Sequence, residues 1–202
     1  TRTRKFLAFA ATTLAATLAF GTPTSARADD SGFNYPEGYP KLGTAQEGFH
    51  GFNVKSTETS RATPTQLFSV HTREGKDAPI KAYCIELDVH SEWGGGMTQT
   101  GWSAFPGKNE FGKSHQIREK VNWIVQRSYP QVDLTQIASA AGASGLTDRE
   151  AITAAQAAIW HLTDNFAFNG LHDWEGARHD TNFQRAHPVQ KVYDYTPGSA
   201  NT

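Results

Sequence analysis

The chain of 202 residues contains one cysteine, Cys84, within the stretch KAYCIELDVH (residues 81–90). Alternation along a predicted strand places Cys84 on the same face as Glu86 and Asp88, opposite an apolar face formed by Tyr83, Ile85, Leu87 and Val89. We therefore expect the thiol at a boundary of the core, with its pKa raised by acidic neighbours. Such a thiol is a poor free nucleophile of the protease kind.

A second unusual residue is Gln156, in the helix predicted for residues 147–164. Its apolar stripe comprises Ile152, Ala155, Gln156, Ile159, Trp160 and Thr163, whereas Glu150, Ala154, Ala157 and His161 turn away. Burying an amide without hydrogen-bond partners costs roughly 1 to 3 kcal/mol. Gln156 is therefore either a core residue bonded to the backbone of a nearby strand or a group that reacts.

One bond would explain both residues. If the Cys84 sulfur attacks the Gln156 side-chain carbonyl and ammonia leaves, an internal thioester forms. The reaction needs close placement of the two groups, donors for the tetrahedral oxyanion and exclusion of water. Trp160, one turn after Gln156, and Tyr83, beside the cysteine, are candidate shields.

The elements that must position this pair change character along the chain. Strand-like alternation occurs at residues 48–56, 65–72 and 80–90. Helical spacing follows, with start signals at Ser114, Asp133 and Thr147 and stop signals at Pro130 and Gly142. The tail from residue 171 onward is aromatic and histidine-rich and shows no clear periodicity. The expected fold is α+β: a strand-rich sandwich or barrel-like part with an inserted or packed helical block, and the thioester at their interface.

Three motifs in this order resemble the thioester domains of Gram-positive bacterial surface proteins. They are Tyr83-Cys84-Ile85-Glu86, then Val121-Asn122-Trp123-Ile124-Val125 followed by Ser128-Tyr129-Pro130, and Ala154-Ala155-Gln156-Ala157-Ala158-Ile159-Trp160. The similarity spans roughly residues 48–165. It implies a Cys84–Gln156 thioester that couples once to a lysine amine of a partner surface protein, so that the chain is an adhesin module and not a turnover enzyme, with no cofactor.

The resemblance leaves two assignments open. The family motif usually reads Thr-Gln-x-Ala, and here Ala155 replaces the threonine, whereas Thr135-Gln136-Ile137-Ala138 carries the literal motif. Gln136 is therefore the second choice for the acyl glutamine. A base would assist the attacking amine, and Glu86, His90 and His161 are the candidates.

Two other functions fit parts of the sequence. A noncovalent surface ligand-binding module would use Trp93, Trp102 and Trp174 as stacking platforms. A cysteine hydrolase or transglutaminase-like enzyme would pair Cys84 with one of the histidines. The acidic and histidine-rich residues 171–180 match no standard metal-ligand spacing, so no metal is expected.

The amino terminus has the basic, apolar and small-residue pattern of a secretory signal peptide. We expect a signal peptide at 1–28, an irregular lead-in at 29–47, the thioester domain at 48–195 and the start of a linker at 196–202. The net charge is −1 before the basic leader is lost, which argues against a nucleic-acid partner. The expected mature protein is a secreted monomer without a membrane span, attached to the cell wall or surface through a further C-terminal region.

Overall fold

The computed structural model describes residues 9–11, 35–56, 62–75, 78–171 and 188–199. The strands of this part form one antiparallel sheet in the order β1-β5-β4-β3-β6, with β2 also paired to β4. Their bounds are β1 Phe9–Ala11, β2 Lys41–Leu42, β3 Phe49–Ser56, β4 Thr63–His71, β5 Ile80–Cys84 and β6 Phe168–Leu171. The predicted α+β class is confirmed.

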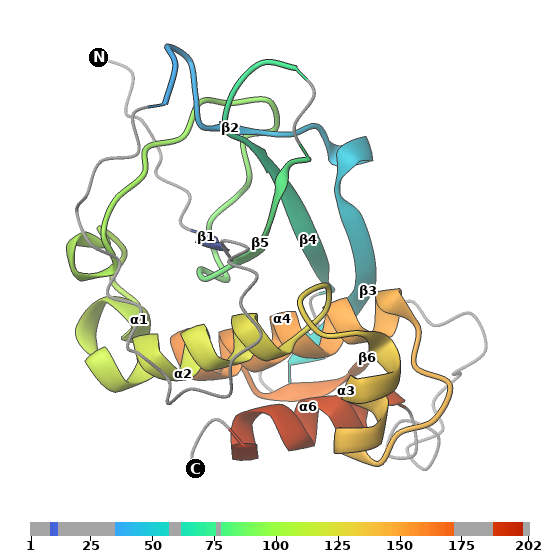
Figure 1. Cartoon of the computed structure of the whole chain (residues 1–202). Helices are drawn as coiled ribbons and strands as arrows, with labels where there is room; N and C mark the ends of the chain where they lie inside the picture. The colour runs from blue at the N-terminus through green and yellow to red at the C-terminus, as the bar shows by residue number, and fades with distance from the viewer. Residues whose placement is uncertain (1–8, 12–34, 57–61, 76–77, 172–187, 200–202) are drawn as a thin grey trace, which may run out of the picture.

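The helices gather in the lower half of the molecule as drawn in Figure 1, while β2, β4 and β5 rise above them. Their bounds are α1 Glu110–Lys113, α2 His115–Arg127, α3 Leu134–Ala141, α4 Asp148–Asp164 and α6 Pro188–Ser199, with short 3-10 helices η1 Ala45–Glu47 and η2 Trp102–Ala104. Helix α4 runs behind α2 and contacts β3, β4 and β5 as well as α2 and α6. It is thus the element that joins the helical block to the sheet.

The predicted signals for the helix ends are confirmed. The Ser114 hydroxyl accepts a hydrogen bond from the Ile117 N–H at the start of α2, and Asp133 caps α3 in the same way. Thr147 and Glu150 form a capping box at the start of α4. Gly142 ends α3 with a left-handed φ of 63°, a conformation that glycine adopts without steric cost.

The predicted amphipathic character of α4 is wrong. Ala154 and Ala157, which were expected to turn away from the core, have exposed fractions of 0%, and Glu150 is also buried. Only His161 of the expected outer face is exposed. The reason is that α4 is enclosed by the sheet on one side and by α2 and α6 on others, and its small alanines allow close approach.

A hydroxyl network fastens α4 to the sheet. The Thr153 hydroxyl accepts a hydrogen bond from the Phe52 N–H at 2.7 Å, and it donates to the Arg149 carbonyl at 2.7 Å. The Thr65 hydroxyl donates to the Phe52 carbonyl at 2.7 Å. A Cβ at Gly51 would collide with the Thr65 and Thr153 hydroxyls, so the glycine allows α4 to approach the strand closely.

The strand that carries the cysteine is shorter than predicted and more deeply buried. It ends at Cys84, so Glu86 and Asp88 lie beyond it. Cys84 packs in one hydrophobic cluster with Phe68 and Trp160. Tyr83 packs in a second cluster on the other face of the strand. The expectation that the thiol lies at a boundary of the core is therefore wrong, because helices and neighbouring strands cover both faces.

Several elements were not predicted. Strand β6 ends at Leu171, helix α6 lies in the tail for which no periodicity was seen, and β2 and η1 occur within the segment expected to be irregular. Residues 9–11, inside the predicted signal peptide, form β1 on the edge of β5. The rest of that peptide lies outside the described residues.

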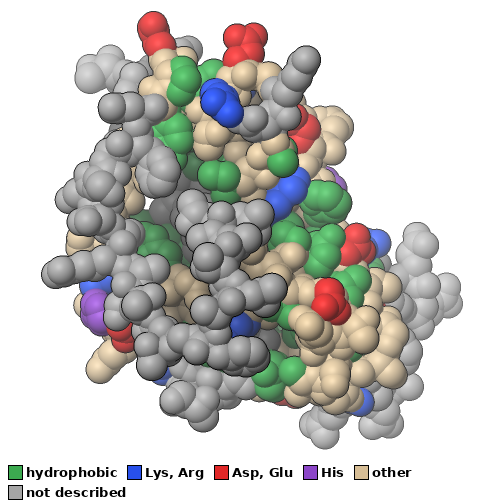
Figure 2. Space-filling model, viewed as in Figure 1, with side chains coloured by type: hydrophobic (Ala, Val, Ile, Leu, Met, Phe, Trp, Pro, Cys, Tyr) green, Lys and Arg blue, Asp and Glu red, His purple; other side chains and the backbone are tan. Residues whose placement is uncertain are grey.

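The surface adds two observations. None of the helices in the described ranges is both long and apolar enough to cross a membrane. On the face shown in Figure 2, the acidic and basic side chains are scattered among other residues and do not form a patch of one sign.

Candidate functional site

The side-chain amide of Gln156 is bound to the backbone of Cys84. The Cys84 N–H donates to Gln156 Oε1 at 3.0 Å, and Gln156 Nε2 donates to the Cys84 carbonyl at 2.7 Å. Gln156 has an exposed fraction of 0% and Cys84 one of 4%. Both polar ends of the buried amide are therefore satisfied by the residue that carries the thiol.

This pairing has chemical consequences beyond satisfying the amide. It holds the Gln156 carboxamide beside the α-carbon of Cys84, from which the thiol projects. The oxygen that would become negatively charged during attack on the carboxamide carbon already accepts the Cys84 N–H. A backbone N–H aimed at a developing oxyanion is the usual device for stabilising tetrahedral intermediates. The arrangement is thus suited to acyl chemistry at Gln156.

The thiol itself is protected in the unreacted state. Its Sγ donates to the Glu86 carbonyl at 3.0 Å. Burial and, to a smaller extent, the nearby carboxylates of Glu86 and Asp164 raise the pKa of Cys84 to about 12, although the hydrogen bond to the Glu86 carbonyl lowers it. The acidic neighbour expected from the sequence does contribute, but loss of hydration is the larger cause. Within the described residues, the hydrogen bonds of Cys84 lead to Gln156 and Glu86 and not to a histidine.

Tyr83 connects two of the sequence motifs. Its hydroxyl donates to the Tyr129 carbonyl at 2.6 Å, so the strand before Cys84 is held to the Ser-Tyr-Pro turn that follows α2. Its phenol is buried, and burial raises its pKa. The side chain therefore seals the face of β5 opposite Cys84 and fixes the position of the strand.

Two polar residues near the thiol were missed in the sequence. Asp164, the last residue of α4, accepts hydrogen bonds from Asn109 Nδ2 at 3.2 and 3.3 Å and from the Thr163 hydroxyl at 2.7 Å. Burial raises the pKa of Asp164, and burial followed by the charge of Asp164 raises that of Glu86. The sequence feature that could have identified Asp164 is its spacing, because it follows Gln156 by eight residues, or about two helical turns.

Asn109 extends this network back to the cysteine strand. Its Nδ2 also donates to the Ile85 carbonyl at 2.6 Å, immediately after Cys84. Its Oδ1 is buried, and no partner for this oxygen is found among the described residues. A buried acceptor without a partner has room to gain a hydrogen bond from an incoming donor.

The other predicted site residues lie at different distances from this centre. Trp160 is buried in the same cluster as Cys84, and its ring packs edge-on against Phe166. His90 is exposed. His161 is exposed as well, with Nδ1 3.2 Å from the Phe166 carbonyl. The structure therefore brings Trp160 and Glu86 to the thiol and leaves both histidines at the surface.

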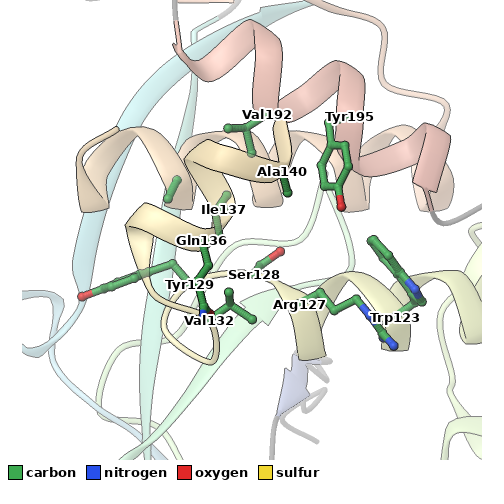
Figure 3. A pocket seen from close by; sticks show the side chains of 11 residues that line it. Trp123, Arg127, Ser128, Tyr129, Val132, Gln136, Ile137, Ala140, Val192 and Tyr195 are labelled. Atoms are coloured by element: carbon green, nitrogen blue, oxygen red, sulfur yellow. The ribbon is translucent and has the colours of Figure 1, made fainter. Parts of the chain in front are cut away.

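Gln136, the second-choice acyl residue, occupies another part of the molecule. It lines a cavity of about 220 Å³ between α2, α3 and α6, together with Trp123, Arg127 and Tyr195 (Figure 3). Cys84 does not line this cavity. The geometry therefore favours Gln156 over Gln136 as the partner of the thiol.

The tryptophans of the noncovalent alternative mainly pack against other rings. Trp93 stacks on Phe68 with a centroid distance of 5.2 Å, although 39% of it is exposed. Trp102 packs edge-on against Phe111. Trp174 and the remaining polar residues of the 171–180 stretch lie outside the described residues.

Comparison with known proteins gives one match. The family model of the thioester domain matches residues 81–202, which is more than half of the chain and includes both Cys84 and Gln156. Searches of curated proteins and of solved structures found no match. The match agrees with the resemblance seen in the sequence motifs and supports a reactive thioester module. This chain belongs to the thioester domain family.

Proposed function

We propose that this chain is a covalent binding module in which Cys84 and Gln156 form an internal thioester that is attacked once by a lysine amine of a partner protein. The observation that carries the proposal is the pair of hydrogen bonds joining the Gln156 carboxamide to the Cys84 backbone. A module of this kind is consumed by its reaction and does not turn over.

Thioester formation involves only groups already in place. The Cys84 sulfur bonds to the Gln156 side-chain carbon, the C–N bond breaks, and ammonia leaves with the thiol proton. The Cys84 N–H stabilises the oxyanion on Gln156 Oε1. Loss of ammonia to the solvent favours the thioester, and the buried Trp160, which packs in the same cluster as Cys84, protects it from water.

Capture of the partner is an acyl transfer. The amine nitrogen bonds to the Gln156 carbon, the C–S bond breaks, and the Cys84 sulfur departs and becomes a thiol again. An amide between Gln156 and the lysine remains. The proton lost by the amine passes first to a base and then to the sulfur. In this proposal Asp164 is the base, because it lies near the thiol, Asn109 links it to the backbone just after Cys84, and burial raises its pKa.

The biological setting follows from the family and the leader pattern. A secretory leader would deliver the module outside the cell, and covalent attachment to a lysine would hold a partner against forces that dissociate noncovalent complexes. We therefore propose an adhesin role at the cell surface.

Mass spectrometry of the intact protein tests the proposal. The native chain should be lighter than its sequence by one ammonia, and methylamine should raise its mass by one methylamine, with the label on Gln156. Cys84→Ala and Gln156→Ala should show the full sequence mass and no addition. Gln136→Ala serves as the matched control and should behave as the native chain does. A native chain of full mass that ignores methylamine would refute the proposal.

A further inference from the structure

The outer edge of the cysteine strand is occupied by another strand. Residues Phe9, Ala10 and Ala11 of β1 pair antiparallel with Cys84, Tyr83 and Ala82 of β5, respectively. The opposite edge of β5 is paired with β4 as far as Tyr83. These three residues of β1 belong to the apolar run of the predicted leader. The edge next to Cys84 is thus able to accept an added strand, and its present occupant is a segment that export would remove.

The backbone groups that this edge offers can be assigned. The N–H and carbonyl of Cys84 are both taken by Gln156, so they are not given to Phe9. Backbone groups of successive strand residues point to alternate edges. Those of Tyr83 therefore face away from Gln156, toward β1. Asn109 lies close by, because its Nδ2 binds the carbonyl of Ile85, the residue after the last one that β1 covers.

We propose that this edge of β5 is the docking site for the partner's reactive segment: an extended, lysine-bearing stretch of polypeptide that adds to the sheet as an antiparallel strand. The inference rests on the proposed function and specifies its substrate. Main-chain hydrogen bonds from such an added strand provide affinity with little demand on side-chain sequence.

The register seen for β1 places the lysine. A residue at the position of Phe9 lies directly opposite Cys84, and directly opposed side chains of an antiparallel pair project from the same face with Cβ atoms about 5 Å apart. A lysine there extends along the Cys84 side chain toward the thioester carbon. Asn109 Oδ1, which has no partner in the described part of the chain, is an acceptor for the amine at this edge.

The same geometry gives the leader a role before export. While β1 is paired with β5, no other strand can use the edge. Removal of the leader would therefore leave the edge of β5 open to an added strand.

Peptides provide the test, in an Ala10→Pro version of the full chain. Proline at this position removes the N–H that faces Tyr83 and so weakens β1. The first peptide is Thr-Val-Lys-Val-Thr with blocked ends. A second carries an N-methyl group on the residue after lysine, whose N–H would face Tyr83. The third peptide is a matched control. It carries the N-methyl group on the second residue after lysine, whose N–H would point away from β5.

Rates of adduct formation are compared with methylamine at equal concentrations of unprotonated amine. We expect the first and third peptides to react at least about tenfold faster than methylamine, since two backbone hydrogen bonds contribute about that factor, and the second to lose the advantage. Relative to the native full chain, Ala10→Pro should raise the rate at which the first peptide forms its adduct and leave the rate with methylamine unchanged. Ala15→Pro, outside β1, should change neither rate.

The outcomes separate the docking site from the chemistry. If methylamine adds to Gln156 but all three peptides react no faster than methylamine, or both methylated peptides lose the advantage equally, the docking inference is overturned and the proposed function stands. If methylamine itself does not add to Gln156, both the docking inference and the proposed function are refuted. Formation of dimers joined through Gln156 in the absence of peptide would show that a second copy occupies the edge, and would also overturn the inference.

Discussion

At the scale of single residues, the site combines a protected thiol with a satisfied amide. The Cys84 thiol is held in its neutral form by burial, and the Gln156 carboxamide has both of its ends bonded to the Cys84 backbone. Neither residue is reactive toward solvent in this state. In the proposed function, their reactivity comes from their mutual placement and depends on the exclusion of water.

The protection of the thiol can be measured when no thioester can form. In Gln156→Leu, which conserves volume, we expect Cys84 to react with iodoacetamide at pH 8 at least about a hundredfold more slowly than free cysteine, because a pKa of about 12 leaves almost no thiolate. In urea the same residue should be alkylated at the ordinary rate. Rapid labelling of the folded protein would contradict the burial described for Cys84.

The role of Asp164 has its own pH signature. Burial raises its pKa above the usual 3.8, and only the ionised carboxylate accepts a proton, so the rate of capture should fall as the pH drops through the raised pKa. Methoxyamine, a weakly basic amine, keeps the nucleophile largely unprotonated in this range. Asp164→Asn should slow capture by about a hundredfold and abolish this part of the pH profile.

A matched variant separates the base from general effects of charge. Glu86→Gln also removes a carboxylate near the thiol, but it should reduce the rate less and keep the pH dependence. Equal effects of the two variants would argue that the carboxylates act only through their summed charge.

At the scale of elements, the attachment of α4 to the sheet determines whether Gln156 reaches Cys84. The Thr153 hydroxyl binds the Phe52 N–H and lies one helical turn before Gln156. We expect Thr153→Val to lower the free energy of unfolding by about 1 to 3 kcal/mol, as measured by urea titration, because a buried hydrogen bond is lost. Thr153→Ser keeps the hydroxyl and should retain most of the stability.

The helix ends, and Gln156 as an unusual residue, were predictable for local reasons. The caps at Ser114, Asp133 and Thr147 are determined by a few adjacent residues, and an amide within an apolar stripe marks Gln156 as unusual wherever the helix packs. The burial of the remaining sides of α4 was not predictable in this way. It depends on α6, which follows a region with no clear periodicity.

Other features depend on contacts between distant segments. The strand of Cys84 alternates as if one face were exposed, yet residues from segments both before and after it in the chain cover both faces. Asp164 and Asn109 are ordinary polar residues in sequence, and only the fold brings them together with Ile85 and Glu86. The two histidines were attractive as bases by residue type alone, and the fold leaves them at the surface.

At the scale of the whole molecule, the proposed thioester would be a cross-link between the sheet and the helical block. It would join residues 72 positions apart, and closing a loop of this length restricts the unfolded chain by about 4 kcal/mol on the scale known for disulfides. Methylamine should therefore lower the melting temperature of the native protein by about 10 °C. Calorimetry of Cys84→Ala, which has no cross-link to lose, should show no change with methylamine.

The burial of α4 has a consequence for the proposed adhesin role, in which the bond to the partner would bear tension. In the proposed reaction the partner's lysine becomes bonded to Gln156 and not to Cys84. Any pulling force is therefore applied to the middle of α4, whose residues from 150 to 160 are all buried. Extracting that helix would require peeling it from the sheet and from its neighbouring helices at the same time. The proposed anchor point therefore lies in a helix that force could displace only by breaking its contacts with several elements together.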